Sequence, residues 1–352
     1  MTTVKAYAAQ NADSPLAPFS LDRRSPETDD VEIEILYCGV CHSDIHTARN
    51  EWQGTMYPVV PGHEIVGRVT KTGSGVTKFK AGDIVGVGCF VDSCRTCSNC
   101  QDGLEQYCEN GHSQTYNSYL QDRKTITYGG YSTHIVVTQD FVLRVSEDLP
   151  LENVAPLLCA GITTYSPLRH WGVTKGHRVG VVGLGGLGHM AVKLAVAMGA
   201  EVTMLSRSPN KKDDAERLGA HHFALTTDKE GVKKLANQFD FIIDTVSAEH
   251  DYNVYLSMLK TNGVMVLLGV PPVPAQVPAA NLIFGRKSLV GSLVGGIRET
   301  QEMLDFCAEH NIVSDVELIS IDQINEAFDR TIDGDVRYRF VIDMKSLKEQ
   351  EN

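Results

Sequence analysis

The sequence has no excess of positive charge. Its 32 Lys and Arg residues stand against 44 Asp and Glu, which gives a formal net charge of −12. Nucleic acid and anionic membranes both need a cationic protein surface, so neither is expected as a partner. The chain also lacks a run of about 18 apolar residues, the length that a transmembrane helix needs. Its N-terminal segment, MTTVKAYAAQ, has no apolar core of the kind found in secretory signals, so a cytoplasmic location is expected.

Internal repeats of about 20–50 residues and low-complexity segments are also missing, which argues against a solenoid or a disordered chain. A length of 352 residues with 42% hydrophobic content is typical of a globular protein of about two domains. Nine cysteines in a reducing compartment favour metal binding over disulfides. Cys38, Cys89 and Cys307 stand in apolar or helical contexts and are interpreted as buried core thiols.

Four other cysteines lie close together in the sequence. Cys94, Cys97, Cys100 and Cys108 are spaced C-x2-C-x2-C-x7-C, with polar residues between them. Thiolates at this spacing can surround one tetrahedral zinc ion at about 2.3 Å each. Since sulfur fills all four positions, the site would be structural, within a surface lobe over residues 89–112. An iron–sulfur cluster is the main alternative, and four unrelated thiols are the other.

The pattern of apolar residues changes along the chain. Up to about residue 150, short alternating segments such as Val31–Tyr37 are separated by Gly and Pro turns, which predicts β-strands. From about residue 155, short apolar strands alternate with helical segments. That alternation predicts a parallel sheet covered by helices on both faces.

A glycine motif opens the alternating half. Gly183-Leu-Gly185-Gly186-Leu187-Gly188 follows the apolar strand Val179–Val182 and begins a helix. This strand–turn–helix context favours a dinucleotide site, because the glycines permit a tight turn and a close approach of the pyrophosphate. The free N–H groups of the helix would face the phosphates. A flexible turn without a ligand is the alternative.

The end of the next strand indicates which dinucleotide binds. NAD sites usually carry an acidic residue there, against the ribose 2′-hydroxyl. This chain has Ser206, Arg207 and, four residues later, Lys211. Hydroxyl and cationic groups suit a 2′-phosphate, so NADPH is expected. A solvated basic loop is the alternative.

A second set of metal-binding residue types is scattered. Cys41 precedes a short polar segment, His63 and Glu64 follow Pro61-Gly62, and Cys159 precedes the alternating half. Two cysteines and one histidine around zinc, with one position open, form a known catalytic arrangement. Taken singly, Cys159 and His63 would more often be core residues, and spacing alone does not join them.

Seven ordered motifs together resemble one family. They are GVCHSD from Gly39, PGHEIVGRV from Pro61, AGDIVGVG from Ala81, the four-cysteine lobe, PLLCAGITTYSPL from Pro156, GLGGLGH from Gly183 and DVRYRFVID from Asp335. The chain resembles the zinc-dependent medium-chain alcohol dehydrogenases, in particular the branch of cinnamyl alcohol dehydrogenases and NADPH-dependent aldehyde reductases. The motifs run from residue 39 to residue 343, nearly the whole chain.

The resemblance implies a catalytic metal site. Cys41, His63 and Cys159 would bind the catalytic zinc, Glu64 would be the acid that approaches the metal when substrate is absent, and Asp44 would orient His63. The remaining implied roles are a proton relay (Ser43 and His46), a structural zinc site (Cys94, Cys97, Cys100 and Cys108), 2′-phosphate contacts (Ser206, Arg207 and Lys211) and further cofactor contacts (Thr163, Val270 and Arg339). Two zinc ions per chain and NADP(H) follow.

The fold implied by the resemblance is α/β. A GroES-like, partly open β-barrel would form the catalytic domain (1–154 and 295–352), interrupted by a Rossmann domain (155–294). Glu299–His310 is predicted to be an amphipathic helix. The resemblance also implies a homodimer, with the segment 281–294 as a candidate contact strand.

Small aldehydes and alcohols are the substrates that the resemblance implies. After Cys108 the chain lacks the tryptophan of the plant lignin-pathway members, so broad activity on aromatic and medium-chain aldehydes is expected. Trp52 is a candidate pocket residue. Two alternatives are a zinc-free quinone reductase, which would lack Cys41, His63, Cys159 and the lobe, and a non-catalytic zinc- and nucleotide-binding regulator.

Overall fold

The computed structural model describes residues 1–350, which form two compact units. The first unit contains Met1–Cys159 and the chain from Gly295 onward; the second is Ala160–Val294. The first boundary therefore lies at Cys159 and not at residue 154. The reason is that the 3₁₀ segment Ala155–Leu158 packs against strands β3, β4 and β5 of the first unit.

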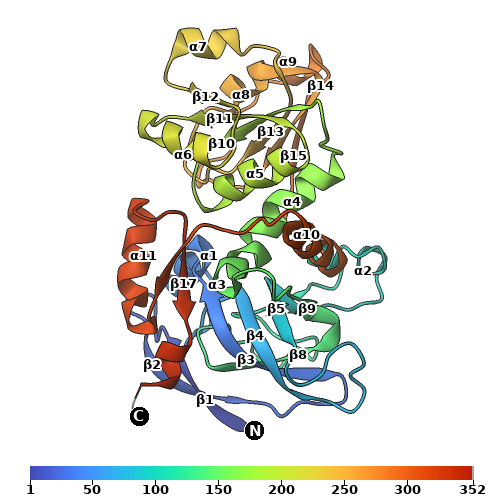
Figure 1. The fold of residues 1–352 in the computed structure, drawn as a ribbon, viewed down its shortest axis with the longest axis vertical. Helices are drawn as coiled ribbons and strands as arrows, with labels where there is room; N and C mark the ends of the chain where they lie inside the picture. Colours follow the sequence, from blue (N-terminus) through green and yellow to red (C-terminus); the bar gives the residue numbers. More distant parts are fainter. Residues whose placement is uncertain (351–352) are drawn as a thin grey trace. The chain divides into compact units, whose positions relative to one another are not determined.

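The first unit is built on β-sheets (Figure 1). Its strands are β1 (Thr2–Ala8), β2 (Ala17–Arg23), β3 (Asp30–Gly39), β4 (Ile65–Thr72), β5 (Ile84–Val87), β6 (Phe90–Asp92), β7 (Ser113–Gln114), β8 (His134–Thr138), β9 (Leu143–Arg144), β16 (Val316–Ile319) and β17 (Arg339–Asp343). The main sheet runs in the order β16-β17-β3-β4-β5-β9, and β8 also pairs with β3. Strand β3 contains the predicted strand Val31–Tyr37, and Val31, Ile33 and Ile35 are fully buried.

Short helices connect these strands. They are α1 (His42–Ala48), α2 (Ser98–Gln101), α3 (Leu151–Val154), α10 (Ile297–Glu309), α11 (Ile324–Asp333) and α12 (Lys345–Lys348). Helix α10 contains most of the predicted helix Glu299–His310. It buries Thr300, Met303, Leu304 and Cys307, which recur at the spacing of one helical face.

The second unit is one parallel sheet with helices against it (Figure 1). Its strands are β10 (Arg178–Val182), β11 (Glu201–Ser206), β12 (His222–Leu225), β13 (Phe239–Asp244), β14 (Leu259–Leu267) and β15 (Ser288–Gly291). Its helices are α4 (Ala160–His170), α5 (Gly186–Ala197), α6 (Lys212–Arg217), α7 (Lys229–Lys234), α8 (Tyr252–Met258) and α9 (Ala280–Ile283). This is the alternating architecture that the sequence predicts.

The strand order β12-β11-β10-β13-β14-β15 identifies the ligand-binding edge of this sheet. The chain moves outward from β10 to β12 and then returns to β13 on the other side of β10. In such sheets ligands bind beyond the carboxyl ends of the strands at this reversal. The glycine turn after β10 and the segment after β13 therefore lie at the edge where such sheets bind ligands.

Among residues 1–350, no helix has both the length and the apolar character that crossing a bilayer requires.

Candidate functional site

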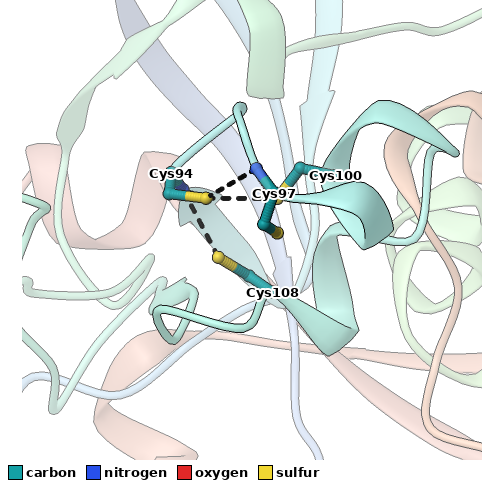
Figure 2. A group of neighbouring side chains, drawn as sticks. All are labelled: Cys94, Cys97, Cys100 and Cys108. Carbon is teal, nitrogen blue, oxygen red and sulfur yellow. Dashed lines mark hydrogen bonds between the residues drawn. The ribbon is translucent and has the colours of Figure 1, made fainter.

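The four lobe cysteines converge on one point in space. Their sulfur atoms all lie within 4.8 Å of one another, and Figure 2 shows the four side chains turned toward a shared centre. The sulfurs of Cys94 and Cys100 are 3.9 Å apart. That separation is close to the about 3.8 Å edge of a tetrahedron whose metal–sulfur bonds are about 2.3 Å. The donor set therefore fits zinc.

Backbone amides donate hydrogen bonds to three of the four lobe sulfurs. The amide of Cys97 donates to the Cys94 sulfur (3.4 Å), that of Cys94 to the Cys108 sulfur (3.5 Å) and that of Glu109 to the Cys97 sulfur (3.5 Å). The pKa of Cys94 is lowered to about 5 by the Asn110 side chain and by the amides of Thr96 and Cys97. A thiolate is the form that binds a metal.

The lobe is joined to helix α10 by two contacts. The Glu105 carboxylate accepts the Ile297 amide in the first turn of α10 (3.0 Å), where a negative charge also favours the helix dipole. The Arg298 guanidinium donates to the Asp102 carbonyl (2.7 Å). The lobe therefore helps to position the helix with which the chain resumes the first unit.

The second cluster assembles from three separate segments of the first unit. Cys41 lies between β3 and α1, His63 and Glu64 immediately precede β4, and Cys159 is the last residue of the unit's first segment. All four are buried, and one ligand atom from each lies within 4.8 Å of the others. The folded chain thus joins residues that spacing alone leaves separate, and the sulfur and nitrogen donors fit zinc.

Asp44 organises this cluster. Its buried carboxylate accepts hydrogen bonds from the Cys41 amide (2.9 Å), the Gly62 amide (3.0 Å), the His63 Nδ1 (3.1 Å) and the Tyr131 hydroxyl (3.2 Å). Since Nδ1 of His63 is engaged, its Nε2 is the atom left to face the cluster. Such a carboxylate–histidine pair orients a metal ligand and raises its basicity.

Buried charged side chains lie beside the cluster and act on Cys41 and Glu64. The pKa of Cys41 is lowered well below its usual value, first by the Cys159 side chain and then, against the effect of burial, by the charges of Arg339 and His63. Glu64 is paired with the buried Arg339 of β17. A Cβ at Gly39 would overlap the Glu64 carboxylate, so only glycine leaves room for this pair. The structure thus gives Arg339, predicted as a cofactor contact, a carboxylate partner beside the metal ligands.

The two residues predicted as a relay lie on helix α1. The hydroxyl of Ser43 is 3.7 Å from the Cys41 sulfur. His46, three residues on, is partly exposed; its Nδ1 contacts the carboxylate of Glu51, and its ring lies 4.8 Å from that of Trp52. Glu51 was not identified from the sequence.

The glycine motif forms a tight turn after β10. Gly183 has a φ of +87°, and a Cβ at Gly188 would collide with the Gly183 carbonyl. Gly185 precedes helix α5 without a side-chain cap, and the space in front of its Cα is open. Gly186 and Leu187 form the first turn of α5. Uncapped amides at an open helix start suit a pyrophosphate.

Strand β11 ends at Ser206, whose hydroxyl accepts the Ser208 amide (3.1 Å). Arg207 is exposed, and Lys211 ends the following 3₁₀ turn. No carboxylate stands at this strand end, which leaves hydroxyl and cationic groups for a 2′-phosphate. Thr163 is buried in α4, whereas Val270 is 78% exposed in the segment after β14.

Several neighbours of the cluster escaped sequence analysis. The ring of Tyr116 lies 5.8 Å from that of His63, and Tyr131 contacts Asp44. Cys38 and Cys307 are buried as predicted, but Cys89 is not a core thiol. It is partly exposed, and its pKa is lowered chiefly by a hydrogen bond with Cys159. No local signal marks these residues, because each acts through a partner distant in sequence.

Two protein-family models match the chain. Residues 27–147 match the model described as the alcohol dehydrogenase GroES-like domain, and residues 186–309 match the model described as zinc-binding dehydrogenase.

Curated relatives align over almost the full length. NADP-dependent alcohol dehydrogenase C 1 of Mycolicibacterium smegmatis is 57% identical over 99% of this chain and 100% of its own. Aldehyde reductase YahK of Escherichia coli is 53% identical over 98% of this chain and 99% of its own.

Among solved structures, the cinnamyl alcohol dehydrogenase SbCAD4 of Sorghum bicolor covers both chains completely, with a TM-score of 0.96 and 49% identity. The Helicobacter pylori enzyme, described as CAD complexed with NADP(H), covers 98% of this chain and 99% of its own, with a TM-score of 0.91 and 46% identity.

The lobe geometry generates a prediction about metal content. Wild-type protein should contain about two zinc ions per chain, one for each tetrahedral site, and Cys97→Ser should contain about one. The variant should also unfold at lower temperature, since metal-binding energy in such a lobe is folding energy. Elemental analysis and thermal unfolding measure both effects. Cys307→Ala, which removes a buried thiol from α10, is the control and should keep both ions; an iron chromophore in the wild type would contradict the assignment.

Proposed function

Since the chain belongs to the NADP-dependent alcohol dehydrogenase and aldehyde reductase family, we propose a specific reaction for it. The family-model matches give it a GroES-like unit and a zinc-binding dehydrogenase unit. The proposed reaction is the zinc-dependent, NADPH-preferring reduction of aromatic and medium-chain aldehydes, and the reverse oxidation of primary alcohols. The observation that carries this proposal is the buried cluster of Cys41, His63 and Cys159 around the Asp44 carboxylate.

Cys41, His63 and Cys159 would hold the catalytic ion. When bound, zinc supplies Lewis acidity that polarises a carbonyl, and NADPH supplies the hydride. Asp44 fixes the ring of His63 so that Nε2 faces the ion. The pairing of Glu64 with Arg339 neutralises one acid beside the site, so the two thiolates can balance the charge of a divalent ion.

Ser43 and His46 would pass a proton to the product oxygen. Their positions three residues apart place them on one side of helix α1. Glu51 contacts Nδ1 of His46 and would orient the ring. His46 remains partly exposed, so it can exchange its proton with solvent.

NADPH is proposed as the preferred cofactor because the end of β11 offers Ser206 and Arg207, with Lys211 one turn later, and no carboxylate. A guanidinium binds a phosphate with charge-assisted hydrogen bonds. Two relatives, an NADP-dependent alcohol dehydrogenase and a CAD complexed with NADP(H), support the same choice.

The substrate proposal is broad. Relatives named as an aldehyde reductase and a cinnamyl alcohol dehydrogenase support aldehydes of both aromatic and other types. Trp52 is 57% exposed beside His46 and offers an apolar surface near the proposed relay. A zinc-free quinone reductase would not need the two metal clusters, and a non-catalytic regulator would not need Ser43 and His46 beside one of them.

A steady-state screen of benzaldehyde, cinnamaldehyde and linear aldehydes, each with NADPH and with NADH, tests the proposed function directly. Activity that is lost on zinc removal and restored by zinc supports it. Turnover that persists in fully zinc-depleted protein would exclude the zinc-dependent mechanism.

The cofactor assignment predicts the outcome of one double variant. Ser206→Asp with Arg207→Ala should raise the Kd for NADPH by about 100-fold while leaving that for NADH within about threefold, because it removes a charge-assisted contact and adds repulsion at the 2′-phosphate. Fluorescence titration of both cofactors measures this change. Equal affinity of the wild type for NADH and NADPH would contradict the assignment.

The chemical step predicts a graded loss of activity. Cys41→Ser should remove or misplace the catalytic ion and reduce aldehyde reduction nearly to background. His46→Ala should lose about 10- to 1,000-fold in kcat, and the loss should vary with pH, as for other proton-transfer groups. Both variants should bind NADPH normally, because the glycine turn and Ser206 belong to the other unit. Full activity in Cys41→Ser protein that contains one zinc per chain would refute this mechanism.

A homodimer is also proposed, and a cytoplasmic location stays a prediction. Within segment 281–294, Ile283, Phe284 and Leu293 are exposed, and β15 is an edge strand. Exposed apolar side chains in a segment that includes an edge strand favour association with a second copy.

The proposed dimer contact predicts that Phe284→Asp shifts the protein from twice the 38.5 kDa chain mass toward the monomer. Phe284 is 91% exposed, so its loss should not disturb the fold of its own chain. Light scattering coupled to size-exclusion chromatography measures the mass. Leu318→Asp, at an exposed apolar position on β16 of the first unit, is the matched control and should leave the mass unchanged.

A further inference from the structure

A buried histidine–aspartate pair lies at the carboxyl end of strand β13, and the proposed chemistry does not use it. The Nε2 of His250 is 2.8 Å from the Oδ2 of Asp244, and its Nδ1 is 2.8 Å from the carbonyl oxygen of Ala248. The two side chains are only 8% and 2% exposed. Both belong to the second unit, at the edge of the sheet where the strand order reverses.

The two contacts together require a doubly protonated ring. A carboxylate oxygen and a carbonyl oxygen are acceptors only, so each ring nitrogen must carry a hydrogen. A neutral imidazole has one N–H and one lone pair. The lone pair would then face an oxygen at 2.8 Å without a hydrogen between them. The geometry therefore fits the imidazolium form of His250.

This ring completes a hydrogen-bond network around residues 244–250, which we name the Asp244 loop. The loop begins with the last residue of β13. The other oxygen of Asp244, Oδ1, accepts the Val246 amide (3.1 Å). Two donors of Thr245 reach back to β10: its amide contacts the Val182 carbonyl at 3.1 Å, and its hydroxyl does so at 2.8 Å. The ring of His250 thus ties both ends of the loop together while Thr245 fastens it to the neighbouring strand.

The Asp244 loop also forms one wall of the glycine turn. The Thr245 hydroxyl lies 3.3 Å from the Gly183 carbonyl oxygen. A Cβ at Gly183 would stand 2.6 Å from a methyl group of Val246, so loop and turn are in close contact there. A displacement of the loop would therefore alter the turn that is proposed to receive the pyrophosphate.

The charged and titratable groups around His250 come from three elements. Asp244 ends β13 and is the nearest anion. Arg207, after β11, is a cation close enough to oppose protonation, and Tyr252 and Tyr255 of α8 contact the ring with centroids 4.6 and 5.7 Å away. The hydrogen bond that His250 donates to Asp244 is the largest effect and raises the pKa of His250 above its usual value, with burial and Arg207 opposing it.

We propose that protonated His250 is a positioning residue for the dinucleotide, because it holds the Asp244 loop against the glycine turn and so maintains the phosphate-binding geometry. This inference rests on the proposed NADP(H)-binding function and adds a residue that does not touch the reacting atoms. It assigns a role to a histidine that neither the glycine motif nor the strand-end residues include.

The role has a defined pH dependence. The pKa of His250 is higher in the ordered loop than its ordinary value of 6.5. Its contribution to the stability of the ordered loop is therefore fully present below pH 6.5. The contribution is lost as pH rises through the raised pKa. Dinucleotide binding should therefore weaken on the alkaline side. The 2′-phosphate does not interfere above pH of about 7, because its second ionisation is then complete.

The test measures the Kd of NADPH and of NADH by fluorescence titration between about pH 7 and about pH 9.5. In wild-type protein both Kd values should rise about tenfold across this range, the effect of losing one hydrogen bond to a charged group. His250→Gln should bind about tenfold more weakly at pH 7 and show no step, since one amide cannot donate to two separated acceptors in the same way.

His250→Lys provides the rescue. An ammonium group has three donors and keeps its charge over this range, so this variant should bind both dinucleotides tightly without the alkaline step. The matched control is His222→Gln, which removes a histidine from a similar pair, His222 Nε2 with Glu201 Oε1 at 2.8 Å. That pair is exposed and stands at the opposite, amino-terminal end of β11 and β12. This control should reproduce the wild-type profile.

The protonation state of the His250 ring can be measured directly by long-range proton–nitrogen NMR of histidine-labelled protein. The His250 signal is identified by its absence in His250→Gln. At about pH 6, below the ordinary value of 6.5, both nitrogens should be protonated. A neutral ring, or a binding profile without an alkaline step, overturns the proposal.

The two cofactors separate the remaining explanations. A step seen with NADPH but not with NADH would make His250 a phosphate ligand and overturn the positioning role. Equal affinity for NADH and NADPH, with the step intact for both, would instead refute the proposed cofactor preference and leave the role of His250 standing.

Discussion

The carboxylate of Asp44 is the constraint on which the first unit's site depends. It is fully buried and accepts four hydrogen bonds, from α1, from the segment before β4 and from Tyr131. Burying an unpaired carboxylate would cost several kcal/mol, whereas hydrogen bonds to a charged group contribute about 1.5–3 kcal/mol each. The fold must therefore bring these donors together to bury Asp44 at all. Since Cys41 and His63 are two of the residues that donate, the network that stabilises the fold also places two of the proposed metal ligands.

The four-cysteine lobe is stabilised differently. Helix α2 contains four residues, of which only Cys100 is buried. The 3₁₀ segment Glu105–Tyr107 contains three residues, of which only Gln106 is buried. So little apolar burial cannot offset the ordering of the chain, and metal binding would supply the difference. Glu105 and Asp102 form hydrogen bonds with the start of α10, a helix with a large buried face. An ordered lobe therefore helps to hold this helix in place. A structural metal site in the lobe would thereby support the part of the chain that completes the first unit.

Sequence patterns predict the structural features that depend on residues close together in the chain. The alternation in β3, the helical face of α10, the glycine turn and the lobe spacing all depend on neighbours a few residues away, and the structure confirms the first three. Several contacts that sequence analysis missed are long-range. Arg339 pairs with Glu64 across 275 residues, and Tyr131 contacts Asp44 across 87. Cys89 was assigned to the core because its apolar neighbours gave no sign of Cys159 beside it. Such pairs depend on how sheets bring strand ends together, which periodicity does not encode.

Residues 1–350 contain two buried histidine–aspartate pairs, and their opposite proton requirements follow from what faces the second ring nitrogen. In His63, Nδ1 contacts Asp44 while Nε2 lies among sulfur and carboxylate ligand atoms, 4.0 Å from Oε1 of Glu64. A cation there would need the lone pair of Nε2, and the hydrogen bond between Nδ1 and Asp44 leaves Nε2 facing the ligand atoms. In His250, Asp244 takes Nε2 and the Ala248 carbonyl takes Nδ1. Neither nitrogen of this ring is left to bind a cation, and the ring itself becomes the positive charge. The same pair of residue types therefore orients a metal ligand in one unit and, by our proposal, fastens a nucleotide-binding loop in the other, and the difference rests on one carbonyl oxygen.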